Sequence, residues 1–182
     1  MKKVAHLLGN GPSKNLFVNN PAGDIYGCNL GEPSLPMTAT FIMDKLVIDH
    51  IANNAVQLNY PVIAPNQYKR IISQVTSVKL QLLDTIPSLL KTGESTGHRG
   101  ATYLIEKGYQ ELHLWGFDSM FRNTIESDTH EKIPEGPADK NNYKKWRGTW
   151  QPIFDLAKSR AVEIITHKPE EANSDNLSAR MV

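Results

Sequence analysis

Four short polar segments of this chain carry residue types that can bind a phosphorylated ligand. In the first, GNGPS at residues 9–13, Gly9 and Gly11 let the backbone turn sharply and approach a ligand closely. Asn10 and Ser13 offer hydrogen bonds, and Ser13 could also cap a following helix, whose N-terminus favours phosphate. Because the segment lacks both the G-x-G-x-x-G spacing and the Walker lysine, it predicts a ligand-binding turn and an ordinary strand-to-helix turn equally well.

The segment at residues 92–100 (TGESTGHRG) points to an anion most strongly. The hydroxyls of Ser95 and Thr96 stand beside Gly97 at the expected start of a helix, and this combination is typical of anion-binding nests. Arg99 adds a guanidinium that can hold a phosphate through two hydrogen bonds. A helix cap without a ligand would use the same residues, and we favour the ligand.

Two further segments directly follow predicted strands. Asn29 comes after the strand expected over 24–28 and could hydrogen-bond a ribose or a base edge, or serve only as a turn residue. Gly116 and Asp118 come after the strand expected over 111–115, and the carboxylate could hold a ribose, a metal or a loop amide, or cap a turn. Ligands of open α/β sheets bind outside the carboxyl ends of the strands. We therefore expect the glycine turn and the hydroxyl-bearing helix start to converge on one nucleotide pocket.

His130 is the candidate general base. It lies in the polar stretch 119–140 next to carboxylates that can tune an imidazole, although a solvated loop histidine has the same signature. No histidines and acidic residues have the H-E-x-x-H spacing, so the sequence predicts no metal site. The single cysteine, Cys28, excludes an intramolecular disulfide and is expected to be a small buried apolar residue.

Charge and hydropathy exclude several classes of partner. The 182 residues contain 20 Lys and Arg against 19 Asp and Glu, and a net charge of +1 gives no electrostatic footprint for duplex nucleic acid. Residues 140–150 interleave basic and aromatic side chains as single-strand binders do, but Trp146 and Trp150 are four positions apart, which favours burial on one helical face. Charges interrupt every apolar run before the roughly 18 residues of a transmembrane segment. We expect a soluble, cytoplasmic protein.

Strand-like and helix-like runs alternate along the chain. Strands are expected at 4–8, 24–28, 38–43, 61–64, 78–83, 111–115 and 162–166, and helices at 45–56, 66–75, 95–108 and 142–158. The strands lack a clean polar face, which favours an α/β fold with a mainly parallel sheet covered by helices on both faces. We assign residues 1–168 to a single domain, with 119–140 as a lid or binding loop, and 169–182 to a flexible tail.

Four motifs occur in order: LLGNGPS (7–13), YGCN (26–29), STG (95–97) and GYQELHLWGFD (108–118). Through them the chain resembles the bacterial lipooligosaccharide sialyltransferases and is similar to the wider G-N-G-P-S family, which includes archaeal hydroxymethylpterin pyrophosphokinases. The resemblance implies a Rossmann-like domain whose glycine turn, Asn29 and STG segment surround a nucleotide such as the cytidine monophosphate of a sugar donor. It also implies that Asn10 and Ser13 bind ribose or phosphate and that His130 takes the proton of an acceptor hydroxyl.

The sequence thus favours an enzyme, a sialyltransferase-like glycosyltransferase that uses a nucleotide-sugar as substrate, a glycan or other hydroxyl as acceptor, and neither a metal nor another cofactor. The sialyltransferases place tyrosines shortly after the Gly-x-Asp motif, where this chain has Ser119, Met120 and Phe121. Two alternatives therefore stay open. One is a nucleotide-binding module without transfer, and the other is pyrophosphoryl transfer to a pterin-like alcohol, which would require Mg²⁺. The sequence does not decide the base, the sugar, the acceptor or whether the chain forms a homo-oligomer.

Overall fold

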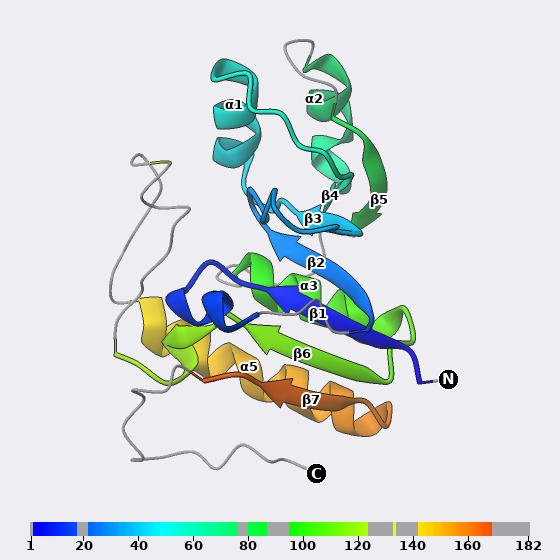
Figure 1. Cartoon of the computed structure of the whole chain (residues 1–182), viewed down its shortest axis with the longest axis vertical. Helices are drawn as coiled ribbons and strands as arrows, with labels where there is room; N and C mark the ends of the chain where they lie inside the picture. The colour runs from blue at the N-terminus through cyan, green and yellow to red at the C-terminus, as the bar shows by residue number, and fades with distance from the viewer. Residues whose placement is uncertain are drawn as a thin grey trace.

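Seven strands form one sheet in the order β5-β4-β3-β2-β1-β6-β7, and every neighbouring pair is parallel (Figure 1). The computed structural model describes residues 2–17, 22–75, 80–86, 95–123, 133 and 142–168. Its strands are β1 (Val4–Leu8), β2 (Asp24–Cys28), β3 (Ala39–Phe41), β4 (Val62–Pro65), β5 (Leu82–Ile86), β6 (Glu111–Trp115) and β7 (Glu163–Thr166). The order reverses between β1 and β6, and the predicted Rossmann-like α/β fold is confirmed.

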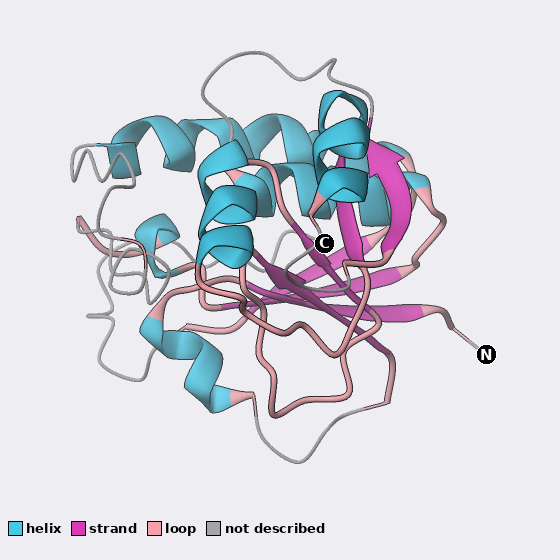
Figure 2. Ribbon diagram, turned by 90° about the horizontal axis from the view of Figure 1, so that it is seen from above, coloured by secondary structure: helices cyan, strands magenta, loops and turns pink. Residues whose placement is uncertain are grey.

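Helices and short 3-10 turns connect the strands. They are η1 (Pro12–Leu16), α1 (Lys45–Asn53), η2 (Asn66–Tyr68), α2 (Lys69–Gln74), α3 (Thr96–Glu106), η3 (Asp118–Met120) and α5 (Asn142–Ser159). Figure 2, in which the molecule of Figure 1 is seen from above, shows a long helix running along one side of the strands. Within the described ranges, no helix combines the length and apolar character that crossing a membrane requires.

The core lies in layers on the two faces of the sheet, because successive side chains of a strand point to opposite faces. Ile63 of β4 belongs to the cluster that packs with Leu104 of α3 and Trp150 of α5. Its neighbour Val62 belongs instead to the cluster formed with Ile48 of α1. Helices therefore cover both faces of the sheet at β4, as predicted.

A row of histidines lies on the face of β1 and β6 that points away from α3 and α5. His6 and His113 are register partners whose ring centroids are 4.7 Å apart. His6 accepts a hydrogen bond from Trp115 Nε1 (3.3 Å), and His113 Nδ1 lies 2.9 Å from His167 Nε2. Burial lowers the pKa of His167 to about 4, so this imidazole is neutral at physiological pH. The other ring nitrogens of His6 and His113 have partners outside the row: His6 Nε2 lies 3.3 Å from Ala22 O, and His113 Nε2 lies 2.8 Å from Glu111 Oε1.

The predicted elements agree with the structure, with one displaced strand. β1, β2 and β6 begin and end at the predicted residues, whereas the strand expected at 78–83 is found at Leu82–Ile86. Pairing with β4 sets its position, through a register shift between Val62 and Ile63. Of the expected 119–140 loop, the structure describes 119–123 and 133, and the tail 169–182 lies outside the described residues.

Candidate functional site

The glycine turn after β1 is bonded to the loop after β6. The backbone N–H of Gly9 donates to Trp115 O (2.7 Å), and that of Gly11 donates to Gly116 O (2.9 Å). A side chain at Gly11 would overlap the Asp118 carboxylate and stand 2.8 Å from Gly116 O. Gly116 itself has φ +72°, which favours glycine. These glycines therefore allow the turn after β1 and the loop after β6 to approach each other closely.

Ser13 and Asp118 complete this junction. Asp118 Oδ2 accepts the Ser13 N–H at 3.0 Å, and Ser13 Oγ accepts the Gly116 N–H at 3.0 Å. Both side chains are buried. Asp118 therefore bonds a backbone amide of the glycine turn, which is one of the partners considered for it. The expectation that Ser13 caps a helix is wrong, because η1 starts after Gly11 without a side-chain cap and the Ser13 hydroxyl serves the junction instead.

The start of α3 meets the end of β2. Ser95 precedes α3 as its N-cap residue, as predicted, and Thr96 Oγ1 donates to Asn29 Oδ1 at 3.2 Å. Asn29 has φ +57°, and its carbonyl accepts from Thr40 Oγ1 at 3.0 Å. The backbone therefore turns sharply at Asn29, directly after β2. The side-chain carboxamide of Asn29 faces the hydroxyl of Thr96, the first residue of α3.

Phe117 joins the two halves of the site. A side chain at Gly97 would overlap its ring, and one at Gly9 would stand 3.2 Å from it, so the ring lies between the glycine turn and the start of α3. The same ring packs edge-on against Trp150 of α5, with centroids 5.3 Å apart. The glycine turn and the start of α3 therefore meet through an aromatic side chain, and the nucleotide pocket expected between them stays a prediction.

His98 is a buried member of the site that the sequence analysis did not single out. Its Nδ1 accepts the Ser95 N–H at 3.0 Å, and its Nε2–H donates to Trp146 O of α5 at 3.0 Å. The side chain is 1% exposed, and burial lowers its pKa to about 4. A neutral imidazole protonated at Nε2 thus fixes the start of α3 to α5. Its signal in the sequence was its place three residues after Ser95, where capping boxes usually hold Glu or Gln.

Other predicted residues surround this centre. Asn10 is half-buried beside the glycine turn, and Arg99 is half-buried in the first turn of α3. From α5, Arg147 Nη2 donates to Arg122 O at 2.9 Å and so holds the chain beyond η3. His130, the predicted base, lies outside the described residues.

Two further observations concern the chemistry available. Complete burial raises the pKa of Cys28 to about 12, so the thiol is not nucleophilic, in line with the expected buried role. In the ranges that the structure describes, no group of three or more His, Cys, Asp or Glu side chains is placed to hold a metal ion.

Known structures share this fold. The sialyltransferase CstII, in a variant solved with CMP, superposes with a TM-score of 0.53 and 17% identity over 92% of this chain and 81% of its own. CstII from Campylobacter jejuni with the substrate analogue CMP-3FNeuAc superposes with a TM-score of 0.53 and 15% identity, over 92% of this chain and 81% of its own. CstII with a trisaccharide acceptor and CMP has a TM-score of 0.52 and 15% identity, over 92% of this chain and 82% of its own. No protein-family model and no curated protein sequence matches the chain. The chain therefore has a sialyltransferase-like fold.

Proposed function

We propose that this chain is a sialyltransferase-like glycosyltransferase that binds a donor of the CMP-sugar type. The observation that carries the proposal is the joining of the glycine turn, Asn29 and the start of α3 at the carboxyl edge of the sheet. Ligands of open α/β folds bind at that edge. Support also comes from the shared fold, because the neighbours were solved with CMP. In the proposed reaction an acceptor oxygen attacks the anomeric carbon of the sugar, the nucleotide leaves, and a base takes the hydroxyl proton.

Nucleotide binding is the first test. A saturating nucleotide stabilises the folded chain, by about 2.7 kcal/mol at 100 times its Kd. For a chain of this size such a gain raises Tm by roughly 5–10 °C. In a thermal-shift comparison of CMP, UDP, GDP and ADP, we expect CMP to give the largest rise. A flat response to all four would contradict the proposal.

Thr96→Val tests the start of α3. The substitution keeps the shape and removes the hydroxyl that bonds Asn29, so we expect CMP affinity to fall roughly 3- to 10-fold in calorimetry. Thr102→Val is the matched control, because the Thr102 hydroxyl bonds the His98 carbonyl within the same helix. If both variants bound CMP alike, Thr96 would have no part in the site.

His130→Ala tests the proposed base, which rests on the sequence. General-base catalysis contributes on the order of 10²–10⁴ in rate, so we expect a loss of that size in sugar transfer with CMP affinity retained. Unchanged turnover would exclude His130 from the mechanism. Transfer should also survive excess chelator, whereas a requirement for Mg²⁺ would favour pyrophosphoryl transfer.

A second candidate is nucleotide binding without transfer. The observation that favours it is the use of Met120 and Phe121 in packing, since Met120 is buried and Phe121 lies against the same core cluster. These side chains offer no hydroxyl to a leaving phosphate. Tight CMP binding combined with neither transfer nor donor hydrolysis would select this candidate.

A further inference from the structure

Glu32, in the loop that follows β2, has a carboxylate that is fixed by neighbouring side chains and is still partly exposed to solvent. Ser34 Oγ donates to its Oε1 at 3.0 Å, and Lys14 Nζ lies 3.6 Å from its Oε2. The Glu32 backbone is fixed as well, because its N–H donates to Met37 Sδ at 3.0 Å and its carbonyl accepts the Leu35 N–H at 3.0 Å. One third of its side chain (33%) remains exposed. A carboxylate has about four acceptor positions, so these contacts leave room for a ligand.

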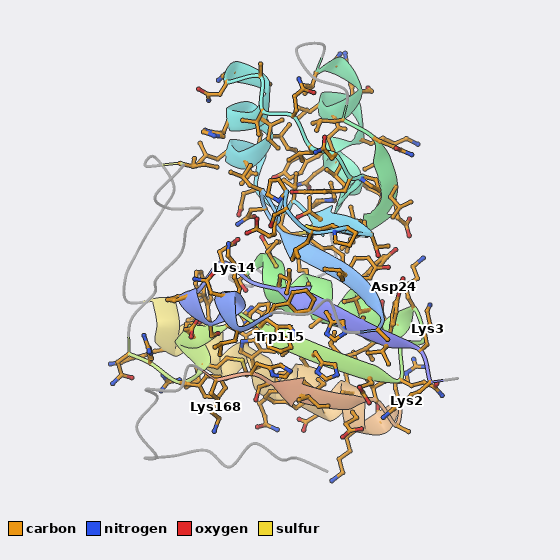
Figure 3. All side chains as sticks on the ribbon, in the orientation of Figure 1. Lys2, Lys3, Lys14, Asp24, Trp115 and Lys168 are labelled. Carbon is orange, nitrogen blue, oxygen red and sulfur yellow. The ribbon has the colours of Figure 1, made fainter. Side chains whose placement is uncertain are left out.

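The ion pair connects the two strand ends that frame the candidate site. Lys14 follows Ser13 of the glycine turn, its Cβ lies against Gly116, and its side chain is only 11% exposed. Figure 3 shows Lys14 beside the arrowhead end of β2. The Glu32 carboxylate therefore stands at the carboxyl edge of the sheet, across from the glycine turn and three residues beyond Asn29.

A carboxylate at this place has a defined chemistry. In dinucleotide-binding folds, whose G-x-G-x-x-G spacing this chain lacks, an acidic residue about 20 residues after the glycine turn bonds the ribose, and Glu32 follows Gly11 at a comparable distance. Two vicinal hydroxyls are two donors, which match the acceptor-only carboxylate. The Lys14 ammonium offsets a negative charge that would otherwise repel the phosphate of the same ligand.

We propose that Glu32 selects ribonucleotides by accepting hydrogen bonds from the 2′ and 3′ hydroxyls of the bound nucleotide, with Lys14 and Ser34 holding the carboxylate in place. The inference rests on the proposed function, because it assigns a role within the same nucleotide site. It adds a charged acceptor for the ribose, which the hydroxyl and amide side chains of the glycine turn and of the start of α3 do not supply.

The experiment compares CMP with 2′,3′-dideoxy-CMP by calorimetry, in the wild-type chain and in Glu32→Gln. We expect the wild-type chain to bind CMP at least tenfold more tightly than the dideoxy compound, since hydrogen bonds to a charged group are strong. In Glu32→Gln this ratio should fall to within about threefold of unity, with dideoxy-CMP affinity retained. Asp49→Asn, which removes an exposed carboxylate paired with Lys45 on α1, is the charge-matched control and should keep the wild-type ratio.

The outcomes distinguish a failure of the role proposed for Glu32 from a failure of the proposed glycosyltransferase function. CMP binding with the same ratio in Glu32→Gln and the wild-type chain overturns the role of Glu32 and leaves the proposed function standing. Failure of the wild-type chain to bind CMP overturns both. Should Glu32→Gln not fold, Glu32→Asp serves instead, because it keeps the charge but shortens the reach, and it should lose discrimination in the same way.

Discussion

A Gly11→Ala variant is expected to lose about 3 kcal/mol of unfolding free energy, because overpacking a tight contact costs this much. Gly11 has φ −80°, which alanine adopts without strain, so the loss comes from contact alone. The added methyl would overlap the Asp118 carboxylate and press on Gly116 O, and both groups are fixed by hydrogen bonds of the junction.

Gly148→Ala is the matched control for this prediction. Gly148 lies inside α5, and a methyl there would meet nothing within 4 Å. Alanine is the better helix former, so this variant should gain about 0.5–1 kcal/mol. Urea unfolding of the two variants measures the difference. A Gly11→Ala chain as stable as the wild type would mean that the junction can open without cost.

The second large effect is expected from His98 as the pH falls. Its folded-state pKa is about 4 against an ordinary value of 6.5, so between these values the unfolded chain binds the extra proton and the folded chain does not. Above pH 6.5 this histidine therefore does not change the free energy of unfolding. As the pH falls from 6.5 to 4, it lowers that free energy by about 3 kcal/mol in total.

His98→Gln isolates this contribution. Glutamine does not titrate, so the pH dependence of the unfolding free energy should become shallower than in the wild-type chain between pH 6.5 and 4. His167 and His6, whose pKa values are also lowered by burial, contribute equally to both proteins and cancel in the difference. A constant difference between variant and wild type across this range would show that His98 is not held neutral. Denaturant titrations at several pH values supply the measurement.

The strands were predictable where apolar runs end at glycine or asparagine. β1 stops at the glycine turn, β2 at Asn29 and β6 at Gly116, and each of these residues turns the chain for a local reason. The displaced β5 had no such boundary. Its position depends on pairing with β4, which precedes α2 in the chain. The residues of β5 alone do not determine that register, so the local sequence could not predict where the strand begins.

Within the candidate site, the sequence identified the participating segments but not their partners. From the sequence, Ser13 was a ligand candidate, and Asp118 a candidate for a ligand, a metal or a loop amide. The structure shows that the two residues bond each other across 105 positions, which the sequence did not predict. The same pattern of hydroxyl-bearing residues and glycines occurs whether these residues bond a phosphate or another loop of the chain. His98 was missed for a related reason, since its second bond goes to a backbone carbonyl of α5, a group that every residue carries.

The position of β1 has a consequence for how the protein is made. β1 lies in the interior of the sheet and pairs with β6, whose Trp115 is the partner of Leu8 more than a hundred positions later in the chain. At ribosomal elongation rates, roughly 5–20 s pass between the appearance of the two strands. During that interval one edge of β1 has no neighbour, and a buried, apolar edge is a template for wrong pairing. We therefore expect nascent chains that stop short of β6 to depend on chaperones and to aggregate when released.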